Sequence, residues 1–224
     1  GLGRMFGFHF DENFTHPFAC KSIAEFWQRW HISLGSFFRD YLLYVPVFGR
    51  PRKYFNLFLV WFCTGMWHGA SWNFIFWGLY FGLFMFLEQK PIKKAMKKWP
   101  TWVKHLYSKI VIIIGFGIVY FEDLGQLGQF FQHVFGISLF THHVAFFDSL
   151  TWSSFVSNCV LIVLAVVISL PVFPKIKEFV LINRNETIYK VGRIGAIVGC
   201  ILLLAISSLL LVDSTNNPFL YFRF

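Results

Sequence analysis

Two histidines are the residues of this sequence whose type and surroundings best suit chemistry. His68 lies within residues 54–87, a run of 34 residues that contains no Asp, Glu, Lys or Arg. An ionisable group at membrane depth is costly, which makes it a candidate functional residue. A neutral imidazole can take the proton from a hydroxyl group whose oxygen attacks an acyl carbonyl. His68 therefore suits acyl transfer, and His31, which lies among aromatic residues, is the second candidate.

Both histidines also have other interpretations. A lone His in an apolar helix is often a core residue that donates to a carbonyl group. A haem or metal pair is a third interpretation, since His is a common metal ligand. The spacing from His31 to His68 matches no ligand motif, so we predict no metal site. The sequence also lacks a phosphate-binding glycine fingerprint and a serine nucleophile elbow.

The helix that carries His68 must break. As one straight helix, 34 residues would measure about 51 Å, whereas the apolar core of a bilayer is about 30 Å thick. Gly69 is conformationally permissive and Ser71 can cap a following helix. We therefore predict two helical pieces over 54–88, broken near His68. Free backbone amides at such a break could hold an oxyanion.

His31 lies on a predicted amphipathic helix over 22–45, with one apolar, mostly aromatic stripe. Apolar residues recur there at helical spacing, and polar residues occupy the opposite face. Ser22 and Glu25 form a capping box at the start, and Pro46 ends the helical region. Such a helix is interfacial or re-entrant, or packs against other helices.

The composition places these elements in a membrane. Hydrophobic residues make up 56% of the chain and charged residues only 14%, against about 25% in soluble domains. This excludes an ordinary soluble globule and a disordered tail. We predict an all-α, polytopic transmembrane helical protein, with further transmembrane helices at 106–121, 153–172 and 194–212. The apolar stretch 127–140 is too short to span and is expected to be interfacial, re-entrant or loop.

The net charge of +9 is consistent with cytoplasmic loops rather than with nucleic-acid binding. Lysine and arginine concentrate at 89–109 and 173–193, whereas 122–150 has neither. The positive-inside rule places the basic loops in the cytoplasm and the other loop outside. We expect 1–224 to form a single membrane domain. Because the chain opens without Met or a signal peptide, we expect it to be the C-terminal portion of a longer protein.

The residues around both histidines resemble a known family. The run EFWQRWHISL at 25–34, followed by FRDYL at 38–42, resembles the signature of membrane-bound O-acyltransferases. The run GMWHGASWN at 65–73 resembles the second histidine motif of that family. Residues 1–8 and 217–224 resemble the branch that contains alginate O-acetyltransferase, which has relatives that transfer D-alanine to teichoic acid.

The resemblance implies an acyl-transfer centre inside the membrane. His68 matches the catalytic histidine of the family, and His31 matches a supporting or substrate-orienting histidine. We expect no tightly bound cofactor, and acetyl-CoA is a candidate acyl donor. The resemblance also makes five further residues candidates for substrate binding: Trp30, Arg39, Asp40, Trp67 and Asn73.

The expected function is O-acetylation of an exported, alginate-like polysaccharide at a bacterial-type cell membrane. The expected partners are the acyl donor, an extracytoplasmic acetylation protein, the polysaccharide pathway and membrane lipids, but no nucleic acid. One alternative is D-alanyl transfer to teichoic acids by the same mechanism. Another is a fragment of a transporter or channel, which would explain the spans but not the two Trp-His motifs.

Overall fold

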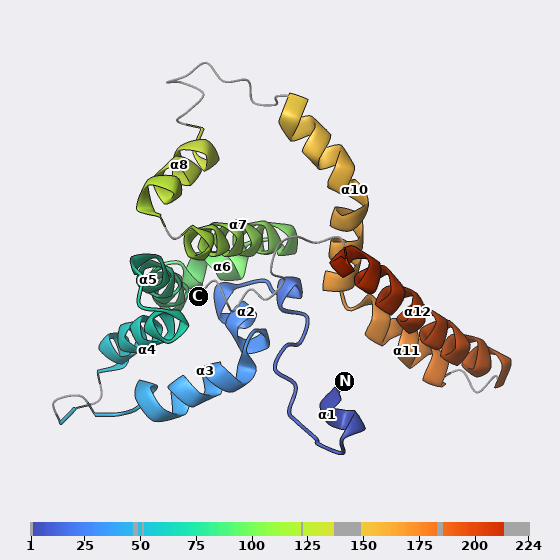
Figure 1. Ribbon diagram of the computed structural model, residues 1–224. Helices are drawn as coiled ribbons and strands as arrows, with labels where there is room; N and C mark the ends of the chain where they lie inside the picture. The colour runs from blue at the N-terminus through green and yellow to red at the C-terminus, as the bar shows by residue number, and fades with distance from the viewer. Residues whose placement is uncertain are drawn as a thin grey trace. The chain divides into compact units, whose positions relative to one another are not determined.

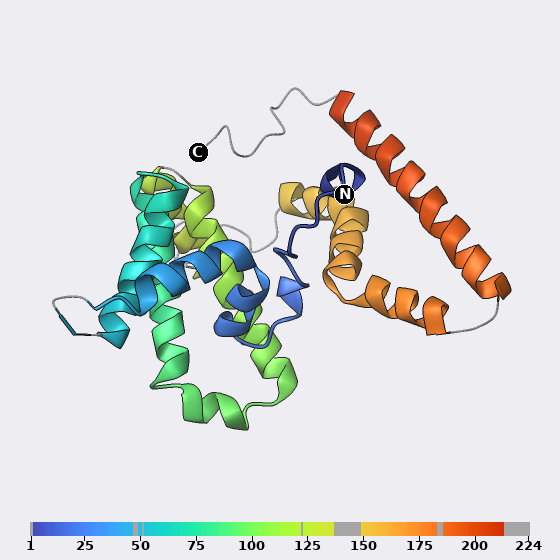
Figure 2. The same cartoon turned by 90° about the horizontal axis from the view of Figure 1, so that it is seen from below.

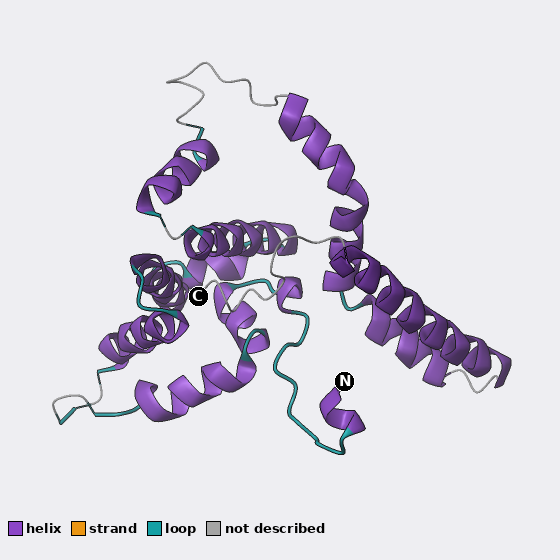
Figure 3. Cartoon of the chain, viewed as in Figure 1, coloured by secondary structure: helices purple, strands orange, loops and turns teal. Residues whose placement is uncertain are grey.

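Helices joined by loops and turns make up the described part of the protein. The computed structural model describes residues 2–46, 49–50, 52–121, 123–136, 149–182 and 186–212. All regular elements within these ranges are helices (Figure 3), which confirms the all-α fold class. We predicted one membrane domain over 1–224; the packing divides this range into two compact units, Gly1–Ser169 and Leu170–Phe224. The C-terminal motif at 217–224 lies outside the described residues.

The first unit holds both histidine motifs. Its elements (Figure 1) are α1 (Leu2–Met5), η1 (Pro17–Ala19), α2 (Ile23–Arg29), α3 (Ile32–Phe38), the π-helix η2 (Arg39–Leu43), α4 (Lys53–His68), α5 (Trp72–Gln89), α6 (Lys93–Lys98), α7 (Thr101–Tyr120), α8 (Leu124–Val134) and α10 (Ser149–Ser169). The second unit contains α11 (Val172–Ile182) and α12 (Glu186–Val212), which pack against each other.

Three described helices are long and apolar enough to cross a membrane. They are α7, α10 and the Glu186–Leu209 part of α12. Each begins earlier than its predicted span at 106–121, 153–172 or 194–212. The extra residues include lysines, such as Lys104 in α7. Long basic side chains can extend from a helix end to the membrane surface, so charge alone is a poor guide to where a spanning helix begins.

Helices α4 and α5 form a hairpin that breaks where the sequence predicts, between His68 and Trp72. The two helices approach closely because glycines face the partner backbone. A Cβ atom at Gly65 would collide with the carbonyl group of Phe74, and one at Gly78 with the carbonyl oxygen of Trp61. Small residues at such crossings let membrane helices come into close contact. The hairpin is thus a tightly packed support for His68.

The prediction of one continuous amphipathic helix over 22–45 is wrong. The segment consists of α2, α3 and η2, and it bends at Trp30 and His31. Trp30 is extended, and His31 has the left-handed angles φ 50° and ψ 50°. The parts before and after the bend, α2 and α3–η2, form the two arms of the segment, and both pack on the hairpin. The apolar stripe therefore continues through the bend, and the helical periodicity of apolar residues does not reveal the break. Figure 2 shows α2 and α3 beside the α4–α5 hairpin.

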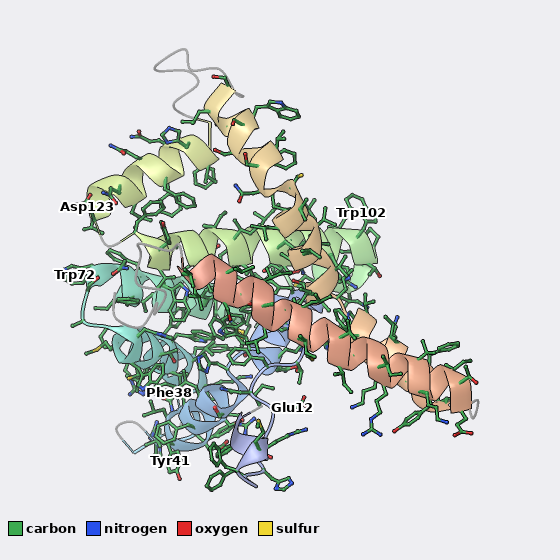
Figure 4. The ribbon with its side chains drawn as sticks, turned by 45° about the vertical axis from the view of Figure 1, so that its right-hand side comes forward. Glu12, Phe38, Tyr41, Trp72, Trp102 and Asp123 are labelled. Carbon is green, nitrogen blue, oxygen red and sulfur yellow. The ribbon has the colours of Figure 1, made fainter. Side chains whose placement is uncertain are left out.

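Helix α7 packs along α5. The Tyr80 hydroxyl donates to the carbonyl oxygen of Val111 at 2.9 Å, and a Cβ atom at Gly115 would collide with the ring of Phe81. Figure 4 shows Trp72 and Asp123 near one end of α7 and Trp102 near the other. Most of the apolar stretch predicted at 127–140 forms the amphipathic helix α8, and its last residues lie outside the described ranges.

Candidate functional site

The structure brings the two predicted histidines together. The ring centroids of His31 and His68 lie 6.5 Å apart, with the rings inclined at 68°. Each histidine lies at a helix break: His31 separates α2 from α3, and His68 is the last residue of α4. The site is therefore formed where two bends in the chain meet.

The first arm of the bent segment is held at its start by Glu88. This carboxylate, at the end of α5, accepts hydrogen bonds from the backbone N–H groups of Ile23 at 2.6 Å and Ala24 at 2.9 Å. Glu88 is only 8% exposed. A carboxylate there accepts from the free amides at the helix N-terminus and interacts favourably with the positive end of the helix dipole. Within α2 itself, Ser22 Oγ accepts from the Glu25 amide as predicted, while Glu25 reaches the amide of Lys21.

The second arm is held at its end by Asn56, which is fully buried in the first turn of α4. Its Nδ2 group donates to the carbonyl oxygens of Leu42, Leu43 and Val45 at 3.3, 3.0 and 2.7 Å. These carbonyls lie at the end of η2, where a helix lacks internal donors. Both arms are thus tied to the open end of the hairpin, and the bend at His31 reaches its closed end at His68.

Aromatic rings surround the histidine pair. Trp67 has its ring centroid 4.9 Å from that of His68 and 6.3 Å from that of His31. Trp77 lies 4.9 Å from His68, also edge to face, and Phe14 lies 5.1 Å from His31. Trp77 is 3% exposed, whereas Trp67 is 54% exposed. The aromatic wall formed by these rings is therefore buried at Trp77 and accessible at Trp67 and at Phe14, which is 46% exposed.

A cavity of about 300 Å³ adjoins His31, between the bent segment and the hairpin. Its lining is mostly apolar, with Trp27 and Trp61 among the larger side chains. Its polar lining residues are Gln28, His31, Ser36, Arg39 and Thr64. Concave, mostly apolar pockets with a few polar groups are typical of small-molecule sites.

The predicted substrate-binding residues occupy different environments. Arg39 lines the cavity and pairs with Asp40 through bonds of 2.7 and 3.3 Å. The hydrogen bond from Arg39 holds the pKa of the Asp40 carboxyl below its usual range. Trp30 instead packs into the core, stacked on Phe26 at 5.5 Å. Of the five candidates, Trp67 lies against both histidines.

The position of Asn73 suits a structural role at the start of α5 better than contact with a substrate. Its side chain is fully buried, and Nδ2 donates to the carbonyl oxygen of Val119 near the end of α7 at 3.1 Å. Its Oδ1 atom is hydrogen-bonded to the hydroxyl group of Ser71. These contacts secure the start of α5, directly after the break at His68.

Burial affects the protonation of the site. It lowers the pKa of His31 below the ordinary value for histidine, because a charged imidazolium loses hydration in an apolar environment. The lowered pKa of His31 favours its neutral imidazole form. Among the described residues, no three His, Cys, Asp or Glu side chains are close enough to form a metal site.

Sequence reasoning missed three residues that position the histidines: Glu88, Asn56 and Asn13. Glu88 and Asn56 are polar residues that are buried at the open end of the hairpin. Asn13 contacts His31 from the segment before η1, with Nδ2 3.4 Å from the imidazole Nδ1. The sequence does offer one signal for Asn56, which is a polar amide side chain near the start of an apolar run. No local pattern connects Asn13 with His31.

Comparison with known proteins agrees with this geometry. The family model for membrane-bound O-acyltransferases matches residues 3–121, which include both histidines and the whole hairpin. The chain belongs to the membrane-bound O-acyltransferase family. Membership in this family favours acyl transfer over the alternative of a transporter or channel fragment.

Several curated relatives share this part of the chain. A probable alginate O-acetylase of Azotobacter vinelandii is 36% identical over 145 residues, which cover 63% of this chain and 29% of that protein. A peptidoglycan O-acetyltransferase of Helicobacter pylori is 44% identical over 87 residues, or 37% of this chain and 16% of the relative. A teichoic acid D-alanyltransferase of Bacillus subtilis is 32% identical over 151 residues, which cover 59% of this chain and 36% of that protein. The chain thus spans about a third or less of the length of these relatives.

Proposed function

We propose that the full-length protein transfers acetyl groups for the O-acetylation of an exported polysaccharide. The observation that carries this proposal is the meeting of His31 and His68, from two separate motifs, at 6.5 Å within an aromatic wall. The alginate O-acetylases among the relatives, at 36–37% identity, support the polysaccharide as acceptor class. The acyl donor is a thioester such as acetyl-CoA, and the protein acts in the inner membrane of a bacterial cell with an extracytoplasmic partner.

In the proposed reaction, His68 is the general base. It takes the proton from an acceptor hydroxyl while the hydroxyl oxygen forms a bond to the acyl carbon. The carbon–sulfur bond of the thioester then breaks, and the thiolate leaving group receives the proton from the imidazolium. The aromatic wall excludes water, which would otherwise hydrolyse the thioester.

The other parts of the site have supporting roles in this proposal. His31 orients the reacting groups from the second bend, and the accessible Trp67 lies at the substrate side. The first backbone amides of α5, which begins at Trp72, lack acceptors within the helix and suit the developing oxyanion. The cavity beside His31, with Arg39 in its lining, offers room for part of a substrate.

The test uses the full-length gene in the bacterium that encodes it. Cells with the gene, without it and with it restored are fed isotopically labelled acetate, and the esters on exported polymers are identified by mass spectrometry. Loss of acetyl esters on deletion and their return on restoration are expected. Loss of D-alanyl esters alone would favour the second candidate, which the teichoic acid D-alanyltransferase relative supports. Unchanged esters of both kinds would contradict the proposal.

A further inference from the structure

The bend at His31 needs support from outside its own segment. A left-handed conformation costs a residue other than glycine about 1–2 kcal/mol, and it persists where surrounding contacts enforce it. His31 also occupies the cap position of α3, but its side chain makes no capping hydrogen bond there. The first amides of α3 must therefore find acceptors elsewhere.

Asn13 supplies these acceptors. Its Oδ1 atom accepts from both the backbone N–H and the hydroxyl of Ser33, each at 2.9 Å. Its carbonyl oxygen accepts from the N–H of Ile32 at 3.0 Å. Two residues later, the N–H of Thr15 donates to the carbonyl oxygen of Arg29 at 2.9 Å. The segment 13–15 thus ties the end of α2 to the start of α3, on both sides of His31.

The same contacts fix which way the Asn13 amide points. The backbone N–H of Ser33 can only donate, so the atom that faces it must be the amide oxygen. The NH2 group then faces His31, with Nδ2 3.4 Å from Nδ1. An amide NH2 group has only donors. The Nδ1 atom of His31 must therefore accept, and in a neutral imidazole the proton then lies on Nε2.

We propose that Asn13 is a positioning residue that holds His31 as the tautomer protonated on Nε2. This inference rests on the proposed acyl transfer and assigns the two histidines different tasks. His31 acts as a hydrogen-bond donor through Nε2–H, and His68 remains the base. A donor fixed before the reaction is effective where negative charge develops on the acyl oxygen.

The test replaces Asn13 with Asp in the full-length protein. The carboxylate keeps an acceptor for Ser33 but presents an acceptor in place of the NH2 group to His31, which favours a proton on Nδ1. Nitrogen NMR of protein labelled in its histidines, reconstituted in lipid bilayers, reports the protonated nitrogen. We expect Nε2–H in the wild type and Nδ1–H in the Asn13→Asp variant. We also expect kcat to fall on the order of 100-fold with little change in KM, the upper end of the loss seen when a partner that orients a metal-ligating histidine is removed.

Glu12→Gln is the matched control, because it changes a neighbouring charge by one unit at an exposed side chain (labelled in Figure 4). It should leave both the tautomer and kcat unchanged. A wild-type His31 protonated on Nδ1 would overturn the inference, and this measurement holds even where the Asp variant does not fold. A variant that retains the wild-type tautomer would also overturn it. A changed tautomer with unchanged kcat would support control by Asn13 but contradict the role of His31 in the proposed function.

Discussion

The helices that form the site and the later helices α10–α12 use polar side chains in different ways. In α2–α7, buried polar groups reach helix ends that are far away in the sequence, as Glu88 reaches Ile23 and Ala24. In α10 and α12 the hydrogen bonds and ion pairs of side chains that the structure describes are local, such as Asn158 to the carbonyl of Ser154 and Lys190 to Glu186. No residue of α10 is buried within the protein.

This contrast shows that a helix needs few specific contacts to be stable in a membrane, whereas a site built from two segments needs contacts that fix those segments. An apolar helix satisfies its own backbone and can face lipid without specific protein partners. Two histidines from different segments stay close only if the helices that carry them are fixed at their ends. The long-range polar contacts of the first region supply this constraint.

Removing the carboxylate of Glu88 should have the largest effect on stability. Glu88→Ala leaves two amides at the start of α2 without their acceptor, and buried hydrogen bonds to a charged group are worth about 1.5–3 kcal/mol. We expect unfolding in detergent to require about 3 kcal/mol less free energy, and acyl transfer to fall as His31 loses its support. Thermal unfolding and the ester assay measure these effects.

Glu186→Ala is the matched change in the other region. Glu186 is exposed, and within the described part of the chain its ion pair is the local one with Lys190 at 2.6 Å, so we expect an effect below about 1 kcal/mol. Equal losses in the free energy of unfolding for Glu88→Ala and Glu186→Ala would contradict the difference between long-range and local polar contacts in the two regions.

Glycine substitutions probe the same difference through packing. Gly78→Ala places a Cβ atom against the carbonyl oxygen of Trp61, which should force α4 and α5 apart and cost about 2 kcal/mol. Gly195 in α12 has no atom within 4 Å of an added Cβ. Gly195→Ala should therefore be neutral or slightly stabilising, since alanine is the better helix former. Thermal unfolding that ranks the two variants in the opposite order would show that the hairpin is not closely packed.

The smallest expected effect is a pH dependence that belongs to His31. Because burial lowers the pKa of His31 in the folded protein, the unfolded chain takes up the proton first as pH falls through about 6.5. The stability that wild type has over His31→Gln should therefore decrease between about pH 7.5 and about pH 5. The facing titratable group, His68, is present in both proteins. An advantage that grows toward acid pH in thermal unfolding would contradict a lowered pKa.

The sequence was a good guide to the parts governed by local physics. The charge-free run around His68 requires a helix break, and Gly69 and Ser71 indicate where it lies. The motifs around both histidines indicate one shared site, and the structure places the two ring centroids 6.5 Å apart; their roles in the reaction stay a prediction. The resulting prediction of a helical, membrane-spanning fold is confirmed.

The positions that depend on distant contacts could not be predicted in this way. The bend at His31 is enforced by Asn13 and Thr15, and the helical periodicity continues across it. Trp30 and Asn73 belong to the expected motifs, yet the core and the end of α7 determine what they contact. Such residues acquire their surroundings only when separate helices pack together.

The most direct test of the central claim is acyl transfer by the full-length His68→Ala protein. His133→Ala is the control, since His133 is exposed on α8 and bonds only to the carbonyl of Gln129 among the contacts described. Both proteins should insert into the membrane and unfold near the wild-type temperature. We expect a loss of about 100-fold or more for His68→Ala, the contribution of a general base, and wild-type transfer for the control. Transfer near the wild-type rate by His68→Ala would contradict the assignment of His68 as the base.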